Sequence, residues 1–298
     1  MRGSTALAAM LLAVAPAAAQ TPPPPPTDTD NQSITVKGRL PEETKRFVET
    51  LSQPSSTSQQ LARWNTPICV VTMGLDVPHG RFVIGRVEQV AEQLDIPVDH
   101  KRCQPNVVIV SIPNADDFTR KLVKKHPALG RVHGYNGYGG GGLAPPSQIH
   151  QLLEPRAVRW FHASITGASS GPDSSGFDAS SIGYMASRIQ LTTRESATLA
   201  FIIVDPDKVV GATWDQLADY LTMVALARPE LGADFGRAPS ILSLYNADGA
   251  MQDKVPSLTR EDRAFLQGLY ESNPDRAAAN QRANIVDRMR HPAANTSH

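Results

Sequence analysis

The chain has no excess of charge of either sign. Its 298 residues include 29 Lys and Arg against 29 Asp and Glu, so the formal net charge is zero. A protein that holds nucleic acid or an anionic membrane through its surface needs a basic excess. The balance therefore argues against nucleic acid as a partner and gives no indication of an anionic membrane surface.

Long apolar runs are also missing beyond the first 19 residues. No later segment reaches the roughly 20 apolar residues that a membrane-spanning helix needs, and we expect no integral membrane segment in the mature chain. The start follows the layout of a secretory signal peptide, with Arg2, an apolar stretch over 6–14 and small residues at Ala17–Ala19. We predict cleavage after Ala19 and a periplasmic or secreted protein. The alternative is an uncleaved membrane anchor.

Cysteine is scarce, since the chain contains only Cys69 and Cys103. An even count in an exported chain suggests one disulfide bond. Cys69 begins one expected strand and Cys103 lies three residues before another, so parallel pairing would bring both to the same end of a sheet. A bridge would contribute roughly 3–4 kcal/mol in the chain-entropy model. The alternative is two free buried thiols.

Histidine pairs with metal-ligand spacing are absent. None of the eight histidines lies three or four residues from another on an expected helix, as two zinc ligands would. His162 lies in an expected strand, where we interpret it as a core or half-buried residue rather than a general base. The sequence therefore assigns no metal, no cofactor and no catalytic residue.

Two glycine-rich matches to catalytic or binding motifs lack the structure that such motifs need. Residues 137–142 match G-x-G-x-x-G, but Leu-Ala-Pro-Pro follows where a dinucleotide site has a helix. Residues 167–171 match the nucleophile elbow G-x-S-x-G around Ser169, with a strand before them but Pro172 in place of a helix. We interpret both as loops. A serine hydrolase using Ser169 with His162 or another histidine is the alternative.

The chain divides by composition into four parts. After the signal peptide at 1–19, residues 20–33 form a polar linker with five consecutive prolines. Residues 34–290 are long enough for a single α/β domain with a sizeable core. Residues 291–298 are expected to form a disordered tail.

Hydrophobic periodicity predicts an α/β (α+β) domain with one mixed sheet of about five strands, packed helices and a helical C-terminus. Strands are expected at 68–73, 106–112, 158–166, 188–192 and 198–205, with a turn at 193–196. Helices are expected at 41–51, 80–94, 116–126, 147–153, 215–227, after a cap at Thr259, and at 275–289. The inner face of 158–166 carries either Val158, Trp160, His162 and Ser164 or Phe161, Ala163 and Ile165. The strand at 198–205 and the helix at 215–227 form the centre of this arrangement.

Three segments carry a resemblance to a known family. They are Arg63-Trp64 with Pro67–Val71, then Thr213–Ala227, then Pro239–Leu242 with Leu258–Tyr270. Over roughly residues 34–289 the chain resembles an uncharacterised family of exported alphaproteobacterial proteins. More distantly it is similar to exported domain-of-unknown-function families whose layout is that of zincin metallopeptidases.

The zincin resemblance implies a metal-binding His-Glu-x-x-His motif on the helix after the edge strand. Here that helix offers Gln216-Leu-Ala-Asp219-Tyr220, with neither His nor Glu. Zinc needs at least three firm ligands, and one Asp does not supply them. The resemblance therefore implies a zincin-like scaffold without catalysis, which binds an unknown protein or small-molecule ligand. An envelope structural protein, suggested by the proline-rich linker, is a further alternative.

Overall fold

The computed structural model describes residues 41–52, 60–100, 103–126, 131–132, 142–143, 146–168, 191–235, 238–245, 251–252 and 255–291. These residues belong to one compact unit that spans Gly38–His298. The expected signal peptide, the proline-rich linker and most of the glycine-rich stretch at 137–142 lie outside the described residues.

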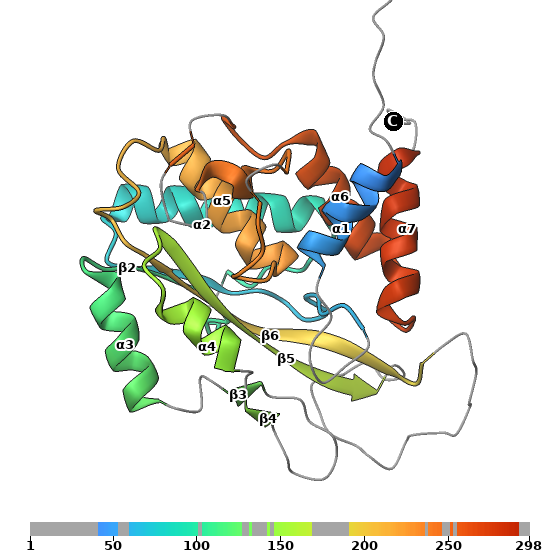
Figure 1. Ribbon diagram of the computed structural model, residues 1–298, viewed down its shortest axis with the longest axis horizontal. Helices are drawn as coiled ribbons and strands as arrows, with labels where there is room; N and C mark the ends of the chain where they lie inside the picture. The colour runs from blue at the N-terminus through green and yellow to red at the C-terminus, as the bar shows by residue number, and fades with distance from the viewer. Residues whose placement is uncertain are drawn as a thin grey trace, which may run out of the picture. The chain divides into compact units, whose positions relative to one another are not determined.

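A mixed four-stranded sheet lies at the centre of this unit, with the strand order β1-β2-β6-β5 (Figure 1). Its strands are β1 at Val70–Met73, β2 at Val107–Ser111, β5 at Val158–Ala168 and β6 at Thr193–Val204. β1, β2 and β6 run parallel, and β5 is an antiparallel edge strand. A separate two-stranded sheet pairs β3 at Arg131–Val132 with β4 at Gly142–Leu143. The mixed α/β class is confirmed, with four strands in the main sheet rather than about five.

The crossover between β1 and β2 is the helix α2 at Val77–Gln93. It begins three residues before the predicted start, because Asp76 caps it by accepting a hydrogen bond from the His79 amide and Pro78 suits the first turn. The turn before it needs glycine. Gly74 has φ +78°, and a Cβ there would lie 2.0 Å from the Ser111 carbonyl oxygen.

Helix α5 at Trp214–Ala227 occupies the middle of the core. The predicted capping box is confirmed: Thr213 accepts from the Gln216 amide, and the Gln216 side chain accepts from the Thr213 amide. Every residue from Gln216 to Ala227 is buried, as expected of a helix that is apolar on nearly all sides. α5 packs between α2, the 3-10 helix η3 at Ile241–Leu244 and α6 at Arg260–Glu271.

The helices lie on both faces of the sheet. The directions of neighbouring side chains on β5 show which helix covers which face. Trp160 points to Tyr220 of α5, whereas the neighbouring Arg159 points to Asp116 of α3. Successive side chains on a strand point to opposite faces, so α3 at Ala115–Lys125 and α5 cover opposite faces (Figure 1). Burial alone would raise the pKa of Asp116, but hydrogen bonds from Lys208 and Arg159 lower it overall.

Three further helices are confirmed close to their predicted bounds, and one starts later than predicted. α1 at Pro41–Leu51 and α4 at Pro146–Leu153 match within one residue, and α6 follows the predicted cap at Thr259. The last helix, α7, covers Ala278–Arg290 rather than 275–289. α1 packs against α7 and touches α6 through an edge-on contact of Phe47 with Phe265.

The predicted strand at 188–192 and turn at 193–196 are wrong where the structure describes them. Leu191 and Thr192 lie outside any strand, and β6 runs without a turn from Thr193 to Val204. A bulge opposite Ala163 and Ser164 leaves Thr198 without a partner in the register. The bulge changes which residues of β6 face α5. Before it these are the odd-numbered Glu195 and Ala197. After it they are the even-numbered Ala200, Ile202 and Val204. On β5, the set beginning with Val158 and Trp160 faces α5.

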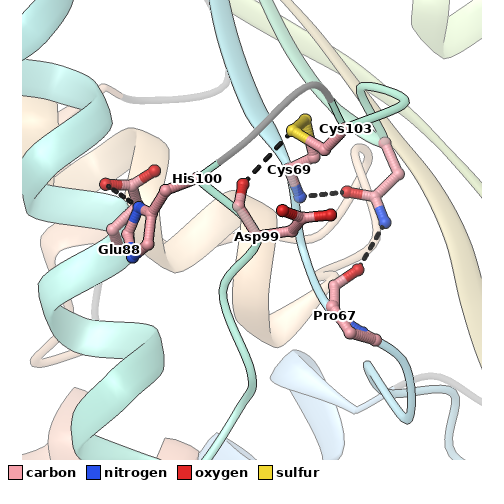
Figure 2. The surroundings of a disulfide bond; sticks show 7 residues. Pro67, Cys69, Glu88, Asp99, His100 and Cys103 are labelled. Carbon is pink, nitrogen blue, oxygen red and sulfur yellow. Dashed lines mark hydrogen bonds and ion pairs between the residues drawn. A yellow bond between two sulfur atoms is a disulfide. The ribbon is translucent and has the colours of Figure 1, made fainter.

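The predicted disulfide between Cys69 and Cys103 is present, with 6.0 Å between the two Cα atoms (Figure 2). Next to it, the Asn106 side chain accepts a hydrogen bond from the Cys69 amide and donates one to the Pro67 carbonyl oxygen. The bridge therefore ties the start of β1 to the segment that leads into β2. Among the described helices, none is both long and apolar enough to cross a membrane.

Candidate functional site

The helix α5 is the place to which the zincin resemblance points, and its polar side chains serve the packing of the domain. Gln216 is 4% exposed. Its side-chain oxygen accepts from the Thr213 amide at 2.9 Å, and its side-chain nitrogen donates to the Val255 carbonyl oxygen at 2.9 Å. Both ends of the amide are therefore used within the fold.

Asp219 is fully buried and forms an ion pair with Arg86 of α2. One carboxylate oxygen accepts from Nε of Arg86, and the other accepts from Nη2 at 3.1 Å and from the Leu258 amide at 2.7 Å. The hydrogen bond to Asp219 raises the pKa of Arg86. This carboxylate joins three segments of the core and has little capacity left for a ligand.

Tyr220 stands where the His-Glu-x-x-His motif has its second histidine. It makes edge-on contacts with Trp160, at 6.3 Å between ring centres, and with Tyr245, at 5.3 Å. Burial raises the pKa values of both tyrosines, so both phenols are neutral at physiological pH. Within the residues that the structure describes, no three His, Cys, Asp or Glu side chains gather as metal ligands.

Ser169, the nucleophile of the serine hydrolase alternative, lies outside the described residues, which stop at Ala168, the last residue of β5. Its pairing with a histidine therefore stays a prediction. His162 lies within β5, and the Nε2 atom of its ring is buried without a hydrogen-bond partner.

A buried polar cluster lies near the same end of β5 and β6. Glu195 is 1% exposed, and its two carboxylate oxygens accept from the hydroxyls of Ser164 at 2.5 Å and Thr166 at 2.6 Å. Burial and then the charge of Arg228 hold the pKa of His162 well below its usual value. Because Ser164 donates to Glu195 and not to His162, the cluster does not contain a Ser–His pair.

Arg228 completes this cluster from the end of α5. Its backbone is left-handed, with φ 55° and ψ 52°, a conformation that costs a non-glycine residue roughly 1–2 kcal/mol. Burial lowers its pKa to about 10, although Glu195 and Tyr270 oppose the shift. Its Nε and Nη1 atoms are buried without a protein partner. The sequence does not predict the burial of Arg228, because nothing in its local pattern indicates it.

Exposed apolar side chains gather at the opposite end of the parallel strands. Six large apolar side chains are clearly exposed among the residues described, and five of them lie where β1 ends and where α2 and α5 begin. These five are Met73 (56% exposed), Val77 (65%), Phe82 (43%), Val210 (77%) and Trp214 (38%). We call this set the apolar edge. The sixth, Leu191, precedes β6 at the other end of that strand.

A stacked pair of rings joins the two halves of the apolar edge. The imidazole of His79 lies on the indole of Trp214 with 3.9 Å between ring centres and 18° between planes. His79 Nδ1 is 2.6 Å from the Asp76 carboxylate. Hydrogen bonds from the His79 amide and ring lower the pKa of Asp76. The start of α2 is thereby fixed against the start of α5.

The surface around the apolar edge carries more carboxylates than cations. Asp76, Asp207 and Asp215 are exposed there, and Arg81 is the exposed cation of the same α2 turns. The nearby Lys208 is paired with the carboxylate of Asp116 at 2.6 Å. Apolar side chains inside a mainly acidic rim suit a partner that is both apolar and basic.

Comparisons with protein families, with curated proteins and with solved structures find no match to this chain. The position of the apolar edge is nevertheless informative, since open α/β sheets bind their ligands outside the carboxyl ends of the strands.

Proposed function

We propose that this chain is an exported, non-catalytic protein that binds a polypeptide partner at its apolar edge. The observation that carries the proposal concerns the part of the chain that the structure describes, where five of the six exposed large apolar side chains lie at one end of the sheet. Scattered exposed apolar residues are ordinary on soluble proteins, whereas a gathered set marks an interaction surface. Export with cleavage after Ala19 and descent from a zincin-like scaffold are parts of this proposal.

The absence of catalysis is inferred from the use that the fold makes of α5. Gln216 caps the helix and Asp219 pairs with Arg86, so the polar groups in the position of a metal motif already have partners. Tyr220 is packed between two aromatic rings. A reaction at this place would require the core to be rebuilt.

The partner's chemistry follows from the rim and the ring stack. Trp214 is 38% exposed although His79 stacks on it, and both apolar side chains and guanidinium groups pack favourably on an indole. The carboxylates of Asp76, Asp207 and Asp215 favour a basic segment and disfavour an acidic one. We therefore expect a peptide segment that combines apolar and basic side chains.

Tryptophan fluorescence of the mature chain tests this proposal. Of the three tryptophans, Trp64 and Trp160 are buried with their indole N–H groups bonded to carbonyl oxygens, so Trp214 is the one that a bound peptide shields. A ten-residue peptide of alternating Leu and Lys should shift its emission and protect it from acrylamide. A peptide of alternating Leu and Glu should bind at least tenfold more weakly.

Two substitutions locate the binding. Met73→Asp should weaken the Leu-Lys peptide at least tenfold, because it places a desolvated charge in the apolar contact. Leu191→Asp is the control, since Leu191 is also exposed but lies away from the apolar edge. Equal effects of both substitutions, or equal affinity for the two peptides, would refute the proposal.

A further inference from the structure

A hollow of about 400 Å³ lies between α1 and α7, on the side of the domain that is closed by the C-terminal helices. Lys45 and Glu49 line it from α1, one turn apart. The residues that line it from α7 are Ala279, Arg282, Ala283, Val286, Asp287 and Arg290. They recur every three or four positions and therefore share one face of that helix. The hollow is separate from the apolar edge and shares no residue with it.

Small side chains on α7 create this space. Ala279 and Ala283 are one turn apart and leave room where larger residues would fill the gap to α1. The helices are anchored beneath it by residues with no exposed surface, among them Val48 and Leu51 of α1 and Ile285 of α7. Because both walls belong to packed helices, the hollow is formed in advance of any ligand.

Charge and hydrogen-bonding capacity then indicate the kind of ligand. The lining has a net positive charge, because it contains three cations and two carboxylates. The cations are Lys45, Arg282 and Arg290, and the carboxylates are Glu49 and Asp287. Arg282 lines the hollow from α7. A guanidinium group binds a carboxylate oxygen more strongly than it binds a neutral acceptor.

We propose that this hollow binds a small amphipathic anion, a carboxylate with an aliphatic body. Its anionic group would meet Arg282, and its aliphatic body would lie against Ala279, Ala283 and Val286. The volume falls within the range of roughly 300–1,000 Å³ that small-molecule sites occupy. The site goes beyond the partner binding at the apolar edge and does not depend on it.

Calorimetric titration of the mature chain with decanoate tests the site, with decylamine as the probe of equal length and opposite charge. Decanoate should bind saturably at one site per chain, and decylamine should bind at least tenfold more weakly. No saturable binding of decanoate, or equal affinity for both probes, would overturn the proposal.

Two pairs of variants locate this binding. Ala283→Leu fills the hollow and should lower the affinity for decanoate at least tenfold, whereas Asn284→Leu, on an exposed neighbour that does not line it, should not. Arg282→Gln should weaken the binding of decanoate about tenfold. Arg288→Gln should not, because Arg288 does not line the hollow and pairs instead with Glu271 of α6. Met73→Asp should leave decanoate binding intact, so that failure here and failure at the apolar edge are distinguishable. Equal affinities within each pair would place the ligand elsewhere.

Discussion

Replacing Arg86 with methionine tests whether Asp219 serves the packing of α5. The Asp219 carboxylate is fully buried, and the substitution leaves it with the Leu258 amide as its remaining donor. Methionine keeps most of the aliphatic length of the arginine, so the main change is the loss of the guanidinium and not a large cavity.

The expected cost follows from burial. Removing one partner of a buried ion pair typically costs about 3–5 kcal/mol, because the other charge stays buried and uncompensated. The Arg86 side chain is 26% exposed and Asp219 only 1%, so solvent already screens part of the attraction on the arginine side. We therefore expect Arg86→Met to lower the free energy of unfolding by about 3 kcal/mol. Asp219→Asn, which keeps an acceptor for the Leu258 amide, should cost less, about 2 kcal/mol.

Urea unfolding, followed by circular dichroism, measures these differences. Arg81→Met is the matched control, since Arg81 lies on the same helix and is exposed, and its effect should stay within about 0.5 kcal/mol. A cost below about 1 kcal/mol for Arg86→Met would refute the assignment of Asp219 to packing, and would make this carboxylate available for another role.

Two further predictions concern pH and the disulfide bond. Below about pH 6.5 the unfolded chain gains a proton on His162 that the folded chain, with its lowered pKa, does not take up. The free energy of unfolding should therefore decrease as the pH is lowered below 6.5, by up to about 1.4 kcal/mol per pH unit. His162→Gln should have a shallower slope between pH 7 and 5.5 in urea unfolding, and identical slopes would contradict the assignment. Replacing Cys69 and Cys103 by serine opens a bridge with a sequence separation of 34, and should cost about 3–4 kcal/mol in the chain-entropy model. A cost below 1 kcal/mol would show that the bridge constrains the unfolded chain little.

Local signals predicted much of the fold. Each capping box joins residues that are three positions apart, Thr213 with Gln216 and Thr259 with Asp262, and both boxes are present. The buried strands and the amphipathic helices are predictable because the hydrophobic periodicity that indicates each one lies within a single short segment of the sequence. The disulfide followed from the two cysteines and the expected parallel pair of strands.

The β6 strand shows where such reasoning fails. Its first residues, Thr193 to Ser196, are polar and were predicted as a turn. Glu195 is instead buried, because hydroxyls on the neighbouring strand β5 bind its carboxylate. The bulge at Thr198 then reverses which residues face the core. Both features depend on a partner strand that lies some 30 residues away in sequence.

The candidate sites also depend on tertiary contacts. Met73 and Val77 have the composition of core residues, and only the end of the sheet leaves them exposed. The hollow needs α1 and α7, which are more than 200 residues apart in the chain. No local pattern around Ala283 distinguishes a lining residue from an ordinary helical alanine.

The bridge between Cys69 and Cys103 has a mechanical consequence. It encloses β1, α2 and the lead into β2 in a covalent ring. A chain stretched from its two ends would extend by roughly 110 Å less than its reduced form, at about 3.3 Å per enclosed residue. A force applied to the two ends of the chain would therefore bypass the ring, and the segment that carries Met73, Val77 and Phe82 would not be stretched while the bridge is intact.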